Sequence, residues 1–348
     1  MGDDLDVVNE YLNVSECLAA AGAKVDPAVW CYFEGGADDE VTLRENLAAF
    51  TRWQLRPRML VDVEEVRLET TLLGAPVSMP LGVAPFAMQR LLDPEGELAT
   101  TRAAAAAGAV MTVPTLTSFR HAEVRTAAEG PQWLQLYVQR DRAQTLDHLS
   151  EARAAGYGAV VLTVDLPHIG RRERDLRLGF AAPTDLPLHY GTLVDVDPTL
   201  TWRDLEWVRA GTGLPLVLKG ILTREDAILA VEHGVEAVWV SNHGGRQLDG
   251  VAAAIDALPE VVEAVAGRCE VYVDGGFRRG GDVVKALALG ARAAFVARPI
   301  AAGLALGGET GVTRILELLR DEIMLALGLV GCTRPEEVTR AHVQHLAA

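Results

Sequence analysis

The segment SNHGGRQLDG combines residue types that could carry acid–base chemistry on an anionic substrate. His243 can accept a proton near neutral pH, and Arg246 offers a planar pair of donors that suits a carboxylate. Gly244 and Gly245 lie between them and allow the backbone to turn, so that both side chains can face one substrate. Asp249 could orient this segment, and it could equally cap a helix. The segment therefore predicts a site that holds an anion beside a proton acceptor.

Lys219 ends the apolar run LVLK, where a buried ammonium needs a negative partner or a catalytic use. One interpretation is a Schiff-base lysine, as in barrel aldolases. Another is a positive charge that stabilises a reduced, anionic cofactor. A salt bridge within the core is the third, purely structural interpretation. The residue types alone leave these alternatives open.

Two later stretches predict a phosphate site. In DGGFR, Gly275 and Gly276 would allow the backbone to approach an anion, and Arg278 adds a fixed charge. Arg298 adds a second charge just before Pro299. Barrels commonly bind phosphate after strands seven and eight, where backbone N–H groups and a helix N-terminus favour the anion. A simple turn is the alternative interpretation of DGG, but it does not explain the two flanking arginines.

Eight short apolar runs, separated by helical segments, recur along the chain. Most are almost continuously apolar, as expected for strands buried on both faces. Alternating strands and helices predict parallel pairing, and eight such units close into a (β/α)8 TIM barrel. The expected strands are Leu81–Pro85, Ala109–Pro114, Trp133–Tyr137, Ala159–Asp165, Pro215–Gly220, Ala237–His243, Glu270–Gly276 and Ala293–Pro299. The expected helices include Asp26–Phe33, Asp39–Phe50, Pro94–Ala107, Thr145–Ala155, Arg224–His233, Ala254–Ala266 and Gly281–Leu289.

Polar residues at the ends of these runs would meet at one mouth, because all strands of such a barrel end on the same face. Arg171–Trp207, rich in Pro, Asp and Gly, is expected as a long loop on that face. Residues 1–60 are expected as helices that cap one end of the barrel, with Tyr32 as a core aromatic residue among them. The polar residues of the strand ends are Gln135, Tyr137, Thr163, Asp165, Arg171, Arg172, Lys219, Ser241, Asn242, His243, Arg246, Asp274, Arg278 and Arg298.

The overall composition excludes several classes of partner. The 348 residues include 32 basic and 48 acidic side chains, which gives a formal net charge of -16. Such a surface repels nucleic acid and anionic membranes, so neither is expected as a partner. The four cysteines form no CxxC pair, which argues against a disulfide scaffold or a metal site. Because the chain shows no secretory signal and no apolar run of transmembrane length, we expect a soluble cytoplasmic protein.

Longer motifs identify a family resemblance. The stretches YFEGGADDEVTLREN, PEGELATTRAA, QLYVQRDR, LKGI, SNHGGRQLDG and DGGFRRGGDVVKALALGA resemble the FMN-dependent L-2-hydroxy acid oxidases and dehydrogenases, from about Pro27 to the C-terminus. This family includes glycolate oxidase, lactate oxidase, mandelate dehydrogenase and hydroxymandelate oxidase. The resemblance implies one domain over 1–348, with a helical cap over 1–60 and the barrel and C-terminal helices over 80–348. It also implies a homotetramer.

The activity implied is oxidation of a small L-2-hydroxy acid to the 2-oxo acid by FMN, with dioxygen as the expected acceptor. A dehydrogenase with another acceptor, or a monooxygenase of the same family, is the alternative. A Schiff-base barrel of the aldolase type and a non-catalytic flavin-binding protein are the rivals from other classes. A Schiff-base barrel does not explain the arginines around His243. A non-catalytic flavin-binding protein would be expected to have lost the charged residues at the strand ends, and all of these are present.

The resemblance also assigns roles to individual residues. His243 would be the base, Arg246 and Arg172 would bind the substrate carboxylate with help from Tyr32, and Tyr137 would contact the substrate hydroxyl. The expected FMN-binding residues are Pro85, Phe86, Ala87, Pro114, Gln135, Thr163, Lys219, Ser241, Asp274, Gly275, Gly276, Arg278, Ala297 and Arg298.

Two departures from the family pattern bear on the substrate. Leu116 replaces a bulky tryptophan of the short-chain oxidases, which favours a larger substrate with an aryl or branched side chain. Phe86 replaces a smaller residue and could fill the same space, depending on where its ring points.

Overall fold

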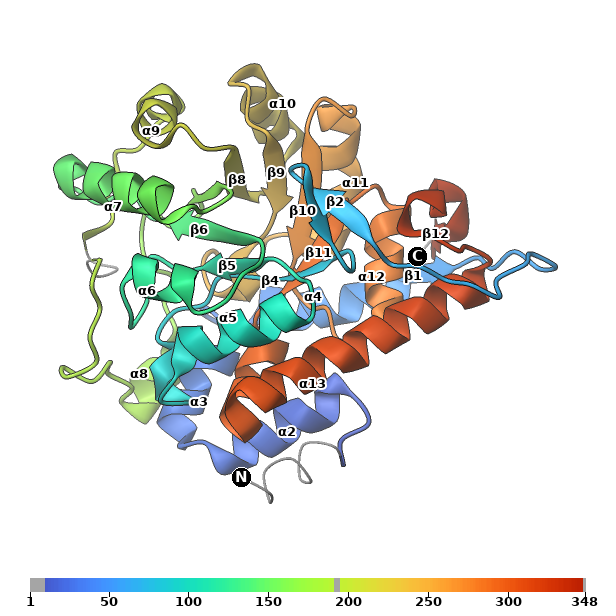
Figure 1. Cartoon of the computed structure of the whole chain (residues 1–348), viewed down its shortest axis with the longest axis horizontal. Helices are drawn as coiled ribbons and strands as arrows, with labels where there is room; N and C mark the ends of the chain where they lie inside the picture. Colours follow the sequence, from blue (N-terminus) through green and yellow to red (C-terminus); the bar gives the residue numbers. More distant parts are fainter. Residues whose placement is uncertain (1–9, 191–194, 347–348) are drawn as a thin grey trace.

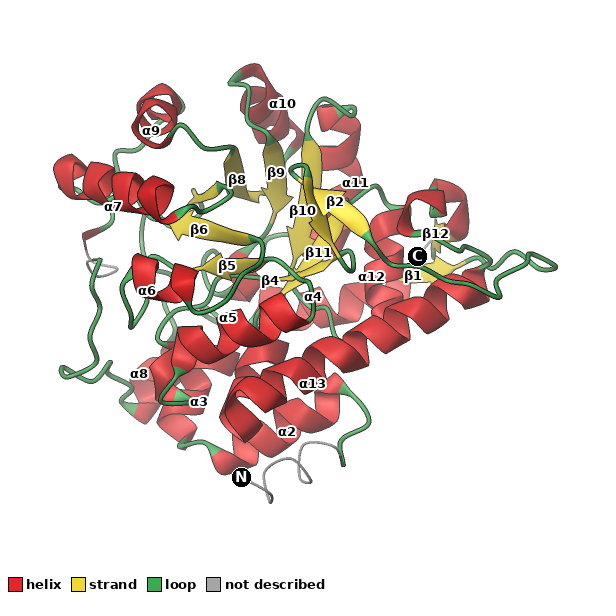
Figure 2. Cartoon of the chain, in the orientation of Figure 1, coloured by secondary structure: helices red, strands yellow, loops and turns green. Residues whose placement is uncertain are grey.

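The computed structural model describes residues 10–190 and 195–346. Eight parallel strands form a closed barrel in the order β10-β11-β4-β5-β6-β7-β8-β9, with helices around it (Figures 1 and 2). Each predicted run overlaps one of these strands, with β6 beginning and β8 ending one residue outside its run, so the predicted (β/α)8 fold is confirmed. The strands are β4 (Leu81–Val83), β5 (Met111–Val113), β6 (Gln132–Leu136), β7 (Val160–Thr163), β8 (Leu216–Ile221), β9 (Ala237–Val240), β10 (Glu270–Asp274) and β11 (Ala293–Val296).

Aromatic side chains fill the inside of the barrel, which makes it a packed core and not a pore. The rings of Trp239 and Phe295 have centres 4.0 Å apart, and Tyr272 packs beside them. Leu72 and Val77 join the same buried cluster. These two residues come from the hairpin of β2 (Thr70–Leu72) and β3 (Ala75–Val77), which therefore closes the end of the barrel opposite to the mouth.

The predicted helices are present with shifts of a few residues at their ends. Around the barrel they are α5 (Gly96–Ala106), α6 (His121–Thr126), α7 (Arg142–Ala155), α10 (Arg224–Glu232), α11 (Ala254–Val265) and α12 (Gly280–Ala288). Before the barrel they are α2 (Val14–Lys24), α3 (Pro27–Glu34) and α4 (Val41–Arg52), followed by strand β1 (Trp53–Leu55), which pairs with β12 (Val343–His345). Short 3-10 helices are η1 (Gln89–Leu91), η3 (His243–Gly245), η4 (Pro335–Glu337) and η5 (Arg340–His342).

The segment predicted as a continuous loop over Arg171–Trp207 contains helix α8 (Glu173–Leu178) and the start of α9 (Asp204–Thr212), so that prediction is wrong in part. Local signals explain α8, because Glu173 lies in its first turn and Gly179 ends it with a positive φ of 67°. Acidic residues stabilise a helix N-terminus, and glycine favours this left-handed end. The remainder of the described segment between these helices is irregular, as expected.

Helix α13 (Arg298–Val330) folds back on itself and depends on a close approach of two glycines. It is interrupted at Gly307 and Gly308, where the backbone leaves helical geometry. The two halves then touch, and a Cβ atom on Gly311 would lie 1.9 Å from the carbonyl oxygen of Gly303. No real Cβ contact is that short. The first half of α13 begins at Arg298, which lines the cavity described below.

We therefore expect Gly311→Ala to lower the free energy of unfolding by about 1–3 kcal/mol, the usual cost of overpacking against backbone. Gly328→Ala is the matched control, because it lies in the same helix and its nearest neighbour is Val66 Cγ2 at 3.5 Å. Alanine at an open helical site should raise stability by up to about 1 kcal/mol. Urea unfolding followed by circular dichroism measures the free energy of unfolding of each variant. Equal changes in this free energy for Gly311→Ala and Gly328→Ala would contradict the packing argument.

Candidate active site

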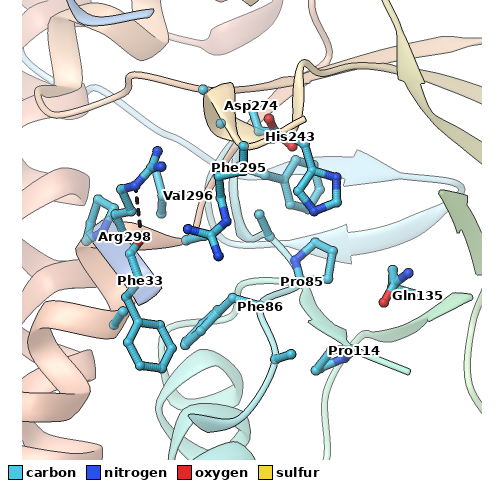
Figure 3. A pocket seen from close by; sticks show the side chains of 18 of the residues that line it. Phe33, Pro85, Phe86, Pro114, Gln135, His243, Asp274, Phe295, Val296 and Arg298 are labelled. Carbon is cyan, nitrogen blue, oxygen red and sulfur yellow. Dashed lines mark hydrogen bonds between the residues drawn. The ribbon is translucent and has the colours of Figure 1, made fainter. Parts of the chain in front are cut away.

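One large cavity opens at the C-terminal ends of the barrel strands. Its volume is about 1020 Å³, counted out to the solvent at its mouth. Figure 3 shows side chains that line it, with His243 and Arg298 facing the same space. All residues that were given a catalytic, substrate-binding or FMN-binding role line it except Thr163 and Ser241, whereas Asp165, Arg171 and Asn242, also expected at the mouth, do not line it. Those that do are Tyr32, Pro85, Phe86, Ala87, Pro114, Leu116, Gln135, Tyr137, Arg172, Lys219, His243, Arg246, Asp274, Gly275, Gly276, Arg278, Ala297 and Arg298.

Thr163 and Ser241 lie directly behind the wall of the cavity. Thr163 accepts a hydrogen bond from Gln135 Nε2 at 3.2 Å. Ser241 is fully buried; it accepts a hydrogen bond from Lys219 Nζ at 2.8 Å and donates one to Asp274 Oδ1 at 2.8 Å. Both hydroxyls thus orient side chains of the wall.

Lys219 has the negative partner that a buried lysine needs. Its Nζ lies 3.2 Å from Asp274 Oδ2, and both side chains are almost fully buried. The core salt bridge of the structural interpretation is therefore present. The ammonium also lines the cavity, so it presents positive charge to whatever occupies this space.

His243 is held by a carboxylate on one side and faces the cavity with the other. Its Nδ1 lies 2.9 Å from Asp165 Oδ1, and its Nε2 lies 3.5 Å from Tyr137 Oη. An ionised carboxylate only accepts hydrogen bonds, so Nδ1 carries the proton and Nε2 is left as the acceptor. Burial lowers the pKa of His243, while Asp165 raises it. The imidazole is therefore a neutral base at neutral pH.

Asp165 is a functional residue that sequence reasoning located at a strand end but gave no role. Burial raises the pKa of its carboxyl, yet the nearby His243 imidazole holds that pKa below the usual range. The signal in the sequence is a carboxylate directly after the apolar run of β7. Its partner lies 78 positions further along the chain, and only the closure of the barrel brings the two together.

Arg172 and Arg246 form one anion site beside Tyr32. The Arg246 guanidinium lies 5.0 Å from the centre of the Tyr32 ring, and that of Arg172 lies 5.9 Å from it. Burial, reinforced by the charge of Arg172, lowers the pKa of Arg246 to about 10. The Arg172 Nε atom is buried with no hydrogen-bond partner. Over residues 10–190 and 195–346, neither guanidinium has a carboxylate within 4.0 Å, so both are free to bind an anionic ligand.

Tyr32 is both a packed aromatic residue and part of the cavity wall. Its ring stacks on Phe180 at 4.9 Å and packs edge-on against Phe33 at 5.0 Å. The prediction of a core aromatic residue, made from its neighbours alone, therefore describes its packing. The same ring also packs against the guanidiniums of Arg172 and Arg246. The sequence around Tyr32 does not indicate this contact, because both arginines are distant in the chain.

Arg278 and Arg298 form a second pair of guanidiniums that line the cavity, which makes them a candidate anion site. Burial lowers the pKa of Arg278 to about 10, and burial with the charge of Arg246 lowers that of Arg298 well below its ordinary value. Arg298 donates hydrogen bonds to the carbonyl oxygens of Phe33 at 3.1 Å and Gly35 at 3.0 Å. Neither has an ion pair with a carboxylate in the described part of the chain. The N-terminus of α13 at Arg298 adds backbone N–H groups, which favour an anion here.

Gly276 has a packing role in addition to lining the cavity, and Asp249 takes one of its two predicted roles. Gly275 and Gly276 have positive φ values of 101° and 85°. A Cβ atom on Gly276 would lie 1.8 Å from the carbonyl oxygen of Asn46, so this glycine makes room for helix α4 in addition to lining the cavity. Asp249 accepts hydrogen bonds from the first N–H groups of α4 and has no hydrogen bond to His243. It is therefore a helix cap, the second of its two interpretations.

Comparison with known proteins decides the family. The model of the FMN-dependent dehydrogenase family matches residues 21–345. The chain belongs to this family. L-lactate oxidase from Nostoc sp. is 44% identical over 96% of this chain and 98% of its own length. Glycolate oxidase 1 from Zea mays is 45% identical over 97% of this chain and 96% of its own length.

Solved structures give the same result. Mandelate oxidase is 44% identical and covers 96% of this chain and 98% of its own, with a TM-score of 0.92. Its complex with (S)-4-hydroxymandelic acid matches with a TM-score of 0.91 at 42% identity, over 97% of this chain and 100% of that one. The predicted resemblance, the barrel fold and FMN as the cofactor of this family member are therefore confirmed.

The residues present fit FMN. The cofactor has one phosphate, and the cavity offers one pair of partly buried arginines, Arg278 and Arg298, at a helix N-terminus. A second pair, Arg172 and Arg246, remains for another anion. Within the described residues, no cluster of three or more His, Cys, Asp or Glu is arranged to hold a metal ion.

A further buried carboxylate, Glu97 of α5, joins two loops of the cavity wall. Its Oε1 accepts hydrogen bonds from the N–H groups of Gln89 at 3.4 Å and Ser118 at 3.3 Å. These loops carry Phe86 and Leu116 of the cavity wall. Glu97 is fully buried and has no cationic partner within 4.0 Å in the described part of the chain, and burial raises its pKa to about 7. Sequence reasoning used this residue only as part of the motif PEGELATTRAA.

We expect Glu97→Gln to change the pH dependence of stability. Between pH 4.5 and 7 the folded chain holds a proton on Glu97 that the unfolded chain has lost, so the free energy of unfolding falls as pH rises. The rise of the Glu97 pKa from 4.5 to about 7 corresponds to a contribution of about 3 kcal/mol to the free energy of unfolding. Urea unfolding from pH 5 to 8 should show the variant gaining stability relative to the parent as pH rises. Glu129→Gln removes an exposed carboxyl and serves as control; a pH-independent difference for Glu97→Gln would refute the assignment.

Proposed function

We propose that this FMN-dependent 2-hydroxy acid oxidase holds the substrate carboxylate between Arg172 and Arg246 and uses His243 as its base. The observation that supports this most is the pair of guanidiniums on the Tyr32 ring, without a carboxylate partner in the described residues. His243 Nε2 lines the same cavity as an acceptor. One bound 2-hydroxy acid can satisfy all three groups.

The two arginines orient the substrate through its carboxylate, because guanidinium donors match both carboxylate oxygens. Holding the carboxylate fixes the position of the carbon that carries the hydroxyl. FMN, when bound, would supply the acceptor for the two electrons and for one of the two protons that the substrate loses. His243 Nε2 takes the other proton, and the Asp165 carboxylate stabilises the imidazolium that forms.

Tyr137 contributes a hydrogen bond beside the base. Its hydroxyl lies 3.5 Å from His243 Nε2, and burial raises its pKa, so the hydroxyl stays protonated and can donate. We assign it to the substrate hydroxyl oxygen. The cofactor phosphate is assigned to Arg278 and Arg298, and the charge of Lys219 to the polar edge of the flavin. The wall from Pro85 to Ala87 would pack along the ring system.

Dioxygen is the proposed acceptor, because the relatives reported above are named oxidases. A Schiff-base reaction at Lys219 is disfavoured by its ion pair with Asp274 and by the family itself. We also propose a single domain, a homotetramer and a cytoplasmic location, on the family resemblance and the sequence. Within the described residues, no helix is both long and apolar enough to pass through a membrane.

The proposed substrate carries an aryl or branched side chain. The cavity wall includes Leu116, Phe33 and Phe86, and the two phenylalanine rings meet edge to face with centres 6.3 Å apart. Phe86 therefore packs toward Phe33 on one side of the cavity, where Figure 3 also shows Arg298. We assign the substrate side chain to the part of the cavity that Leu116 lines, where an apolar wall favours an apolar group.

We expect His243→Ala to keep FMN and to reduce it with substrate about 10²–10⁴-fold more slowly, the usual loss for a general base. FMN content is read from its absorbance after heat release, and reduction from anaerobic stopped-flow absorbance.

Arg246→Lys tests the proposed binding of the substrate carboxylate. It keeps the charge but lacks the paired donors, so both substrate affinity and rate should fall. Reduction at the parent rate by either variant would remove that residue from its proposed role.

We expect the chain to reduce its flavin more efficiently with (S)-mandelate than with glycolate, because each buried CH₂ group contributes about 0.8 kcal/mol. Leu116→Trp should lower this preference by filling the space, and Leu116→Met, which conserves volume, is the matched control. The measurement is the ratio of second-order rate constants for the two acids. A ratio below one in the parent chain would show that Phe86, and not Leu116, limits the cavity.

A further inference from the structure

Helix α4 touches two different turns of the cavity through one residue, Asn46. Asn46 is 2% exposed and does not line the cavity. Its Nδ2 donates to Asn242 Oδ1 at 2.8 Å, and its Oδ1 accepts from Asn242 Nδ2 at 2.8 Å. Asn46 Oδ1 also accepts a hydrogen bond from the N–H group of Ala254 at 3.2 Å. This reciprocal amide pair joins segments 196 positions apart.

The partner of Asn46 controls the backbone that carries the base. Asn242 directly precedes His243, and its Oδ1 also accepts from the N–H group of Gly245 at 3.2 Å. Its Nδ2 donates to the carbonyl oxygen of Ala252 at 3.0 Å. His243 itself has a φ of 57°, a left-handed conformation that is strained for a residue with a Cβ atom. The Asn242 side chain bridges the turn around this strained residue, and Asn46 holds that side chain in place.

The backbone of Asn46 supports the other turn. The carbonyl oxygen of Asn46 would lie 1.8 Å from a Cβ atom on Gly276, and its side chain lies 3.4 Å from the Cβ position of Gly275. These glycines lead into Arg278, which belongs to the second anion site. One residue outside the cavity is therefore packed against the turn of the base and the turn of the phosphate-site arginine.

We propose that Asn46 is a positioning residue that fixes the His243 turn relative to the Gly275–Gly276 turn, and so sets the base against the cofactor site. This inference rests on the proposed function, since it assigns His243 and the second anion site their roles there. A purely structural role would lower stability and leave the chemistry of the folded holoenzyme unchanged. A positioning role requires that the rate per bound FMN depends on the amide pair.

The test uses two variants of the full-length holoenzyme. Asn46→Asp keeps the shape of the side chain but sets a carboxylate oxygen against Asn242 Oδ1, and Asn46→Ser shortens the side chain so that it no longer reaches Asn242. Thr42→Val is the matched control. Thr42 is a fully buried residue of the same helix, and its hydroxyl accepts a hydrogen bond from Gly250 in the same loop, away from His243.

Both Asn46 variants should retain FMN and reduce it at saturating (S)-mandelate about 10- to 100-fold more slowly, because a misplacement near 1 Å costs a factor of this order. The pH profile of kcat/KM should shift in these variants as the surroundings of His243 change. Thr42→Val should remain within about 2-fold of the parent rate, although its melting temperature falls. Adding Asn46→Ser to His243→Ala should slow the reaction little further, since both act through the same base.

The outcomes separate the two proposals. If His243→Ala reduces its flavin as fast as the parent chain, the proposed function fails. If His243→Ala is slow but both Asn46 variants match the parent rate and pH profile per bound FMN, the positioning inference alone is overturned. A lower melting temperature with an unchanged rate of flavin reduction would show that Asn46 has a purely structural role. If the Asn46→Asp chain does not fold, the rate and pH profile of Asn46→Ser test the inference.

Discussion

The positive charge gathered at the mouth of the barrel is the constraint around which the site is organised. Arg172, Arg246, Arg278 and Arg298 lie partly buried around one cavity without carboxylate partners among the described residues, which opposes folding because cations lose solvation as they are covered. Backbone carbonyl oxygens of Phe33 and Gly35 offset part of this cost. Anionic ligands would offset the remainder, so the same charge that destabilises the empty cavity favours a phosphate and a carboxylate.

The acid–base part of the site depends on a second feature, the pairing of groups from two strands that have β8 between them. Strand β7 supplies Asp165 just beyond its end, and strand β9 supplies His243 in the same way. Parallel strands in a closed barrel bring such ends to one face, so a hydrogen bond can form between residues far apart in the chain. The aromatic packing inside the barrel makes this scaffold rigid, which keeps the base and the arginines at fixed separations.

The helices before the barrel do more than close one end of it. Tyr32 from α3 supports two arginines, and Asn46 from α4 contacts the turns after β9 and β10. The sequence predicted these helices over residues 1–60. It did not indicate which turns they touch, because packing partners depend on side chains that are distant in the chain.

The sequence by itself determined the barrel and most of the cavity wall. Apolar runs of strand length are a local property, and the polar residue after each run must lie at the mouth once the strands pair. Helix α8 was missed because its six residues give a weak period, although Gly179 marks its end. Only the tertiary structure decided the partner of His243, the direction of Phe86, the double role of Gly276 and the place of Asn46. Each of these depends on distances between segments, and those distances are set when the whole barrel closes and its core packs.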